Sequence, residues 1–157
     1  MLIPERLAAA FRRGAKGGGV LADCVFCRIA AGTIPCARLF ENEDVLAFLD
    51  IAPVRPGHAL VIPKAHFPTL FELPAGLGGA LLAAAGRVGA AVMQAVGAEG
   101  LNLQMNNLAA AGQLVMHAHL HLIPRQSGDG LALWPQHPYP GTDEMNALAE
   151  RIRNALR

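Results

Sequence analysis

Short apolar-rich runs bounded by turn residues predict five β-strands in the middle of the chain. They are expected at residues 37–41, 45–49, 59–62, 101–106 and 115–123. Asn42, Glu43 and Asp44 form a turn between the first two strands, and Pro53 and Pro56 break the chain before the third. Because turns this short join neighbouring strands, the sequence favours an antiparallel sheet over repeated β-α-β units.

A second apolar pattern, with helical spacing, predicts one long helix over residues 77–96. The stripe consists of Leu77, Leu81, Ala85, Val88, Val92 and Val96. The other faces of this helix also carry small or apolar residues, so more than one side of it needs cover. A central core helix and a dimer interface both satisfy that need, and both interpretations stay open.

Shorter helices complete the expected fold. One helical turn follows Pro68, and a final helix is expected over residues 143–156, with Thr142 as its N-cap. The predicted fold class is therefore α+β: an antiparallel five-stranded sheet with one long and several short helices. We expect the sheet to continue across a homodimer, with the long helix and residues 101–106 at the interface.

Three segments are expected along the chain, of which residues 21–126 form the main domain. Residues 1–20 read as an N-terminal helical extension, helical over 4–13, followed by a Gly-rich joint. Residues 127–157 read as a C-terminal tail and helix packed on the domain. No internal repeat accompanies them.

Neither a secretory signal nor a membrane span is expected. The short apolar run at residues 7–11 precedes its positive charges, whereas a secretory signal places the charges first. Arg87 lies near the centre of the long apolar helix, and glycine and alanine dominate over leucine there. We therefore expect a cytoplasmic protein.

Composition narrows the classes of function. Of 157 residues, 53% are apolar and only 16% are charged, which excludes a disordered chain and indicates that a partner hides some apolar surface. Thirteen Lys and Arg against twelve Asp and Glu give a net charge of +1, so neither nucleic acid nor an anionic membrane is an expected partner. Three cysteines indicate a reducing compartment and metal or redox use.

Three histidines alternate with apolar residues at His117, His119 and His121. In a strand, alternate residues share a face, so the three imidazoles are expected on one side. The outer pair would lie about 13 Å apart at Cα, and one tetrahedral ion cannot take all three rings unless the strand bends. The spacing therefore favours one nucleophilic imidazole with a neighbour on each side over a His-only metal hydrolase.

The segment from Gly112-Gln113 through the three histidines to Pro124-Arg125 resembles the signature of the histidine triad nucleotide-binding superfamily. Residues 24–35 resemble the N-terminal segment of that family, and residues 48–53 and 57–66 resemble its nucleotide-binding strands. The resemblance covers roughly residues 24–125, in the family's order. The chain is identified as a bacterial-type member with an N-terminal CxxC pair.

The resemblance implies an enzyme that hydrolyses or transfers nucleotidyl groups at the α-phosphate of a purine nucleotide. Nucleotide phosphoramidates and dinucleoside polyphosphates are the expected substrates. His119 matches the nucleophile, which forms a nucleotidyl-histidine intermediate, and the backbone carbonyl of His117 fixes its tautomer. His121 and His58 match contacts to phosphate oxygens. This chemistry requires no catalytic metal.

The resemblance also implies roles for four further residues. Gln113 matches a residue near the bridging or leaving oxygen, and Asn106 matches a phosphate or ribose contact. Asp50 and Ile51 match the ribose and base pocket, although an Asp before a Pro-rich turn is often only a cap.

The chain departs from the family pattern in two places. Leu114 stands where many members carry Ser or Thr, so the choice of leaving group is open, and the loop at residues 107–111 lacks a glycine often found there. The alternative function, a nucleotide-binding regulatory or interaction module with little or no turnover, rests on these two departures.

Cys24 and Cys27 have the spacing of a zinc knuckle, and two distant ligands would complete a tetrahedral site. In zinc-bearing members of the family those ligands match His66 and His117. A structural zinc ion is therefore the expected cofactor. A redox-active CxxC pair and two plain reduced cysteines remain alternative interpretations.

Overall fold

The computed structural model describes residues 22–157, so the helix predicted at residues 4–13 and the Gly-rich joint lie outside the described residues. The chain divides into two compact units: one ends at Ser127, and the other covers Gly128–Arg157. The first unit contains the sheet and all the predicted site residues.

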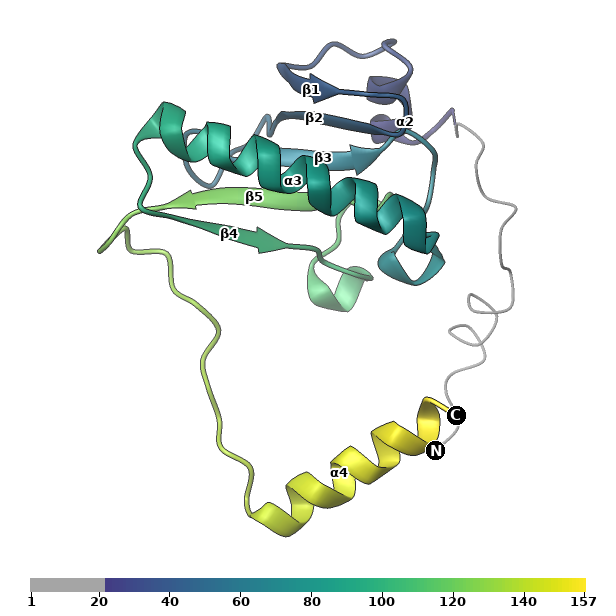
Figure 1. Cartoon of the computed structure of the whole chain (residues 1–157), viewed down its shortest axis with the longest axis vertical. Coiled ribbons are helices and arrows are strands. Elements are labelled where there is room, and N and C mark those ends of the chain that lie inside the picture. Colours follow the sequence, from purple (N-terminus) through teal and green to yellow (C-terminus); the bar gives the residue numbers. More distant parts are fainter. Residues whose placement is uncertain (1–21) are drawn as a thin grey trace. The chain divides into compact units, whose positions relative to one another are not determined.

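One five-stranded antiparallel sheet forms the first unit, in the order β1-β2-β3-β5-β4 (Figure 1). Its strands are β1 (Arg38–Glu41), β2 (Val45–Leu49), β3 (Ala59–Pro63), β4 (Gly100–Gln104) and β5 (Leu120–Arg125). Its helices are α2 (Val25–Ala30), α3 (Ala75–Val96) and two 3-10 turns, η1 (Leu70–Glu72) and η2 (Ala109–Ala111). The predicted α+β class, with its antiparallel five-stranded sheet and one long helix, is confirmed.

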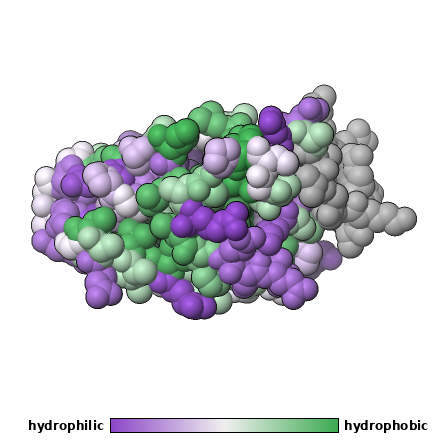
Figure 2. All heavy atoms as spheres, turned by 90° about the horizontal axis from the view of Figure 1, so that it is seen from above, coloured by the Kyte–Doolittle hydropathy of each residue, from purple (hydrophilic) through white to green (hydrophobic). Residues whose placement is uncertain are grey.

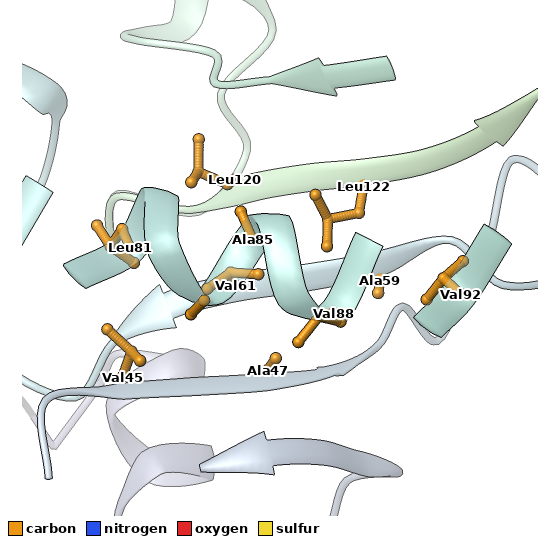
Figure 3. Close-up of a cluster of buried hydrophobic side chains, with 11 residues drawn as sticks. Val45, Ala47, Ala59, Val61, Leu81, Ala85, Val88, Val92, Leu120 and Leu122 are labelled. Atoms are coloured by element: carbon orange, nitrogen blue, oxygen red, sulfur yellow. The ribbon is translucent and has the colours of Figure 1, made fainter. Parts of the chain in front are cut away.

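The long helix α3 covers one face of the sheet. It starts after Pro74 and ends at Gly97, which takes the left-handed conformation (φ 66°) that glycine adopts without steric cost. Between α3 and the sheet lies a buried aliphatic cluster (Figure 3). It consists of Val45, Ala47, Ala59, Val61, Leu81, Ala84, Ala85, Val88, Val92, Leu120 and Leu122.

The opposite face of the sheet packs against the short helix α2. Phe26 and Ile29 of α2 join a second buried cluster with residues of β2 and β3: Leu46, Phe48, Leu60 and Ile62. Residues in β2 and β3 thus alternate between the two clusters, as expected for strands that are covered on both faces.

The fifth strand starts at Leu120, and the prediction that it starts at Val115 is wrong. β3, the neighbour of β5, pairs with it only from Ala59 to Val61 and ends at Pro63, which has no N–H to donate. The main chain before β5 is bonded elsewhere: the N–H of Ala118 donates to the carbonyl of Phe67 at 2.6 Å. His117 and His119 therefore precede the strand.

The second unit contains one helix, α4 (Thr142–Ala155). Gly141 is its N-cap, so the prediction that Thr142 is the cap is wrong. Asp143 and Glu144 lie in its first turn, where acidic side chains are stabilised by the positive end of the helix dipole.

The apolar helix α3 is long enough to cross a membrane by length and composition alone. Within the described structure it is instead the core helix of the sheet unit, and its own residues Leu81 and Val88 are buried against the sheet. Hydrophobic residues also reach the surface, and Figure 2 shows them gathered in the middle of the face seen from above.

Candidate functional site

The imidazoles lie on the α2 face of the sheet. His121 pairs directly with Leu60, which belongs to the α2-side cluster, so the two side chains point to the same face. The ring of Phe26 contacts the rings of His117 and His119 edge-on, at centroid distances of 5.9 and 5.2 Å. The rings of His119 and His121 lie 4.9 Å apart.

The tautomer of His119 follows from one hydrogen bond. Its Nδ1 lies 2.7 Å from the backbone carbonyl oxygen of His117, and a carbonyl oxygen can only accept. His119 therefore carries its proton on Nδ1. The lone pair of the neutral ring is on Nε2, where a nucleophile needs it.

The tautomers of His58 and His121 follow in the same way. The backbone N–H of Val54 donates to Nδ1 of His58 at 3.2 Å, so the proton of His58 is on Nε2. That Nε2 lies 2.9 Å from Nδ1 of His121 and donates to it. His121 in turn carries its proton on Nε2, and this N–H remains as a donor for an anionic ligand.

Asp50 lies beside His58 and closes a local turn. One carboxylate oxygen accepts from the N–H of Ala52 at 2.9 Å, and the other lies 3.6 Å from Nδ1 of His58. The first contact is an Asx turn, as the cap interpretation expects. The side chain of Ile51, the next residue, is fully exposed.

Burial keeps the imidazoles of the site neutral. Loss of water lowers the pKa of His119, which the hydrogen bond to His117 and the carboxylate of Asp50 only partly oppose. Loss of water also lowers the pKa of His58, which Asp50 partly opposes. Burial, with the neighbouring rings of His119 and His58, lowers the pKa of His121 to about 4. At neutral pH the site therefore presents uncharged rings.

A second cluster joins the N-terminal segment to the sheet. Cys24, Cys27, His66 and His117 bring one ligand atom each to within 4.8 Å of one another. Nδ1 of His117 faces both thiols, at 3.5 Å from Cys24 and 3.6 Å from Cys27, and Nδ1 of His66 lies 3.3 Å from Cys27.

The donor chemistry of this cluster fits a zinc ion. Nε2 of His117 donates to the carbonyl oxygen of Pro63 at 2.8 Å, so its Nδ1 lone pair faces the sulfur atoms. Two thiols and two imidazoles form a complete set of tetrahedral zinc ligands.

The remaining predicted residues lie in the loop before the triad. Asn106 accepts from the side-chain amide of Gln104 at 3.3 Å, whereas Gln113 is buried and bonded to main-chain groups. Leu114 is 94% exposed.

Sequence reasoning missed two residues that shape the site, Phe26 and Pro63. Phe26 stands between the two cysteines of the CxxC pair, and this position was the available signal. Pro63 directly follows the strand predicted at residues 59–62, and only the folded structure shows that its carbonyl orients His117.

Three comparisons with known proteins identify the family. The HIT domain family matches residues 31–128. The chain is 40% identical over 137 residues to adenosine 5'-monophosphoramidase hnt1 of Schizosaccharomyces pombe, which covers 86% of this chain and 99% of that protein. It is 44% identical over 112 residues to adenylylsulfatase HINT3 of Arabidopsis thaliana, covering 71% of this chain and only 56% of that longer protein.

Solved structures agree with these sequence matches. The crystal structure of SMU.412c from Streptococcus mutans is 37% identical, with a TM-score of 0.85, and covers 99% of this chain and 100% of that one. A zinc-bound histidine triad family protein from Mycobacterium smegmatis is 36% identical, with a TM-score of 0.68, and covers 85% of this chain and 97% of that one. The chain described here belongs to the HIT family.

Proposed function

We propose that this HIT protein is a nucleotidyl hydrolase or transferase that cleaves its substrate at the α-phosphate through a nucleotidyl-histidine intermediate. The observation that carries the proposal is the 2.7 Å hydrogen bond from Nδ1 of His119 to the carbonyl of His117. It leaves a lone pair on Nε2 of a neutral, buried ring. Relatives named as a monophosphoramidase and an adenylylsulfatase support this reaction class.

In the first step Nε2 of His119 attacks the α-phosphorus. A P–N bond forms, and the bond to the leaving group breaks, taking its electron pair with it. The imidazole becomes cationic, and the carbonyl of His117 stabilises the Nδ1–H of that cation. In the second step water attacks phosphorus, the P–N bond breaks and the water proton is lost, so that nucleoside monophosphate is released and the histidine is restored.

One neighbouring imidazole stabilises the charge on phosphate, and a second one orients it. The Nε2–H of His121 donates to a non-bridging oxygen, and His58 fixes the tautomer that makes this possible. Because a protein nitrogen supplies the attacking atom, the reaction requires no catalytic metal. His58 and Asp50 extend the same polar surface towards the nucleoside, with Ile51 and Asn106 as further substrate contacts.

The proposed substrate is a purine nucleotide bonded at its α-phosphate to an amine or to a second phosphate. The names of the two relatives favour adenine as the base. Leu114 supplies no hydroxyl to a leaving group, so turnover should depend on how readily that group departs unaided.

The test is a single-turnover experiment with adenosine phosphoramidate and diadenosine polyphosphate. Wild-type enzyme, quenched within the first turnover, should carry one adenylyl group on the peptide that contains His119, as read by mass spectrometry. His119→Ala should lose at least about 1,000-fold in kcat while still binding AMP. His119→Gly with added imidazole should recover part of the activity, which shows that the variant fold is intact.

Two outcomes would overturn the proposal. Full turnover by His119→Ala, or activity that chelators abolish and only a metal restores, would transfer the chemistry to a metal hydrolase. Nucleotide binding with no turnover of either substrate by the wild type would favour the regulatory or interaction module.

We also infer that the cluster of Cys24, Cys27, His66 and His117 holds a structural zinc ion. All four positions of a tetrahedral ion would be filled by the protein, which leaves none for water or substrate. When bound, the ion would link the start of α2 to the segment that carries His66 and to the segment that carries His117. The zinc-bound relative from Mycobacterium smegmatis supports this choice of metal.

A second copy of the chain is the partner that we propose, with a cytoplasmic location and no nucleic-acid or membrane partner. The outer face of α3 carries mainly small and apolar residues, and β4 lies at an open edge of the sheet. Pairing two copies along this side would cover both and continue the sheet across the dimer.

A further inference from the structure

Leu108 has an unusual backbone conformation for a leucine. Its φ is 71° and its ψ 161°, and it is the one non-glycine residue with positive φ within residues 22–157. In this region the Cβ atom clashes with the main chain, so glycine is the residue that adopts it freely. Other interactions must therefore hold Leu108 in place.

Gln113 holds both main-chain groups of Leu108. The N–H of Leu108 donates to Oε1 of Gln113 at 2.7 Å, and the N–H of Gln113 donates to the carbonyl of Leu108 at 3.2 Å. The two bonds close a ring around the 3-10 turn η2. The strained residue and its clamp thus form one unit.

The amide nitrogen of Gln113 also makes its hydrogen bonds within the protein. Nε2 donates to the carbonyl of Pro68 at 2.6 Å and to the carbonyl of Val115 at 3.0 Å. A carboxamide nitrogen has two hydrogens, so both are used within the protein. Because Gln113 is also 4% exposed, it would have to break a main-chain bond before it could donate to a substrate.

The clamp joins three segments that meet at the site. These are the loop that carries Asn106, the segment that follows His66, and the main chain that leads into His117. A parallel bond reinforces the first joint, because Oδ1 of Asn107 accepts from the N–H of Leu70 at 2.7 Å.

We propose that Gln113 is a positioning residue: it holds the strained Leu108 and thereby fixes the Asn106 loop against the triad, without contacting the leaving group. This inference rests on the proposed hydrolase function. It assigns Gln113 a different task from the leaving-oxygen contact that the family resemblance implies.

The test combines two substitutions. Gln113→Leu should lower kcat by about 100-fold, the cost of a small misplacement of catalytic groups, and change the AMP dissociation constant by less than about threefold. Adding Leu108→Gly should restore at least about tenfold of kcat, since glycine adopts the loop conformation without the clamp. Gln126→Leu is the matched control: its Nε2 donates to the carbonyl of Gly97 at 2.8 Å, outside the site, and kcat should not change.

A direct contact with the leaving group predicts the opposite result. In that case Leu108→Gly restores nothing, because the lost donor stays lost, and the proposal is overturned. A readout on the wild type is independent of how the variants fold. The side-chain amide resonance of Gln113 should be protected from solvent exchange and unmoved by AMP, and a large shift on binding would refute the clamp.

Failure of the hydrolase assignment would look different. If the wild type turned over neither substrate, the two substitutions would still report on the clamp through urea unfolding. Leu108→Gly should then gain less stability, or cost more, in the Gln113→Leu background than in the wild type, because the unclamped loop has already released part of the strain, and strict additivity would count against the clamp.

Discussion

Burial sets the protonation state of each imidazole in the site, and with it the stability of the fold. The pKa of His121 is lowered from 6.5 to about 4 because water is excluded and the rings of His119 and His58 are close. In the unfolded chain the same ring takes up a proton near pH 6.5. Folding therefore keeps His121 neutral between these two values.

The free energy of unfolding should fall as the pH is lowered from 6.5 to about 4, because only the unfolded state gains a proton on His121 in this window. Across this pH window the lowered pKa corresponds to a change of about 3 kcal/mol in the free energy of unfolding. Because water reaches part of the site, we expect about 2 kcal/mol. Urea unfolding of wild type and His121→Asn at pH 7.5 and 4.5 measures the effect. The variant should lose less stability on acidification, and equal losses would contradict the assignment.

Side-chain direction explains which residue roles the sequence predicted. The alternation of His117, His119 and His121 with apolar residues predicted three rings on one side, although only His121 belongs to a strand and the other two rings are placed beside Phe26. The amide of Gln113 was beyond prediction, because its partners Pro68 and Leu108 come close to it only in the folded chain. The family resemblance had implied the tautomer of His119, whereas the tautomers of His58 and His121 depend on the N–H of Val54 and on the contact between the two rings, which no residue pattern records.

At the scale of elements, α2 depends on what it packs against. Six residues are too few for a helix that is stable by itself in water. Phe26 and Ile29 anchor one side of it in the core, and Cys24 and Cys27 anchor its start beside His66 and His117.

We predict that the purified protein contains close to one zinc ion per chain, and that removing the ion loosens α2. Chelation should lower the melting temperature by at least about 5 °C and speed amide exchange over Val25–Ala30. Elemental analysis measures the ion. Cys24→Ser should lose it, whereas Cys36→Ser, outside the four ligands, should keep it; zinc-free wild type, or zinc retained by both variants, would refute the site.

Strand boundaries show where the sequence ceases to predict elements. Four strands begin and end within two residues of the predicted bounds, because turn residues and prolines flank most of their apolar runs. The start of β5 was wrong by five residues. A strand also needs a neighbour to pair with. β3 ends at Pro63, so the residues before Leu120 continue the apolar pattern but have no strand beside them.

At the scale of the whole molecule, two exposed features adjoin each other. α3 contains a single charged residue, Arg87, in 22, and Leu82 on its outer face is 58% exposed. β4 has β5 as its neighbour on one side and an open edge on the other, where Leu103 is 46% exposed. An exposed apolar helix beside a strand with one open edge is typical of an interface between copies of a chain.

We predict a homodimer that forms through this side. At micromolar concentration, sedimentation should give a species of twice the 16.5 kDa of one chain. Leu82→Glu should shift it towards the monomer, because two carboxylates would be buried without partners. Leu39→Glu is the control, since Leu39 is 44% exposed on β1, at the opposite edge of the sheet. A wild type that sediments only as a monomer would rule the dimer out.

His117 shows that a three-histidine pattern is not three copies of one chemical part. Only its main-chain oxygen reaches His119, and every amino acid has such an oxygen. Nδ1 of its imidazole faces the two thiols, and Nε2 donates to the carbonyl of Pro63. In the centre that we propose, residue 117 contributes only a peptide group beside the rings of His119, His121 and His58. The choice of histidine at position 117 is then explained by the thiol cluster behind that centre, and not by the proposed reaction.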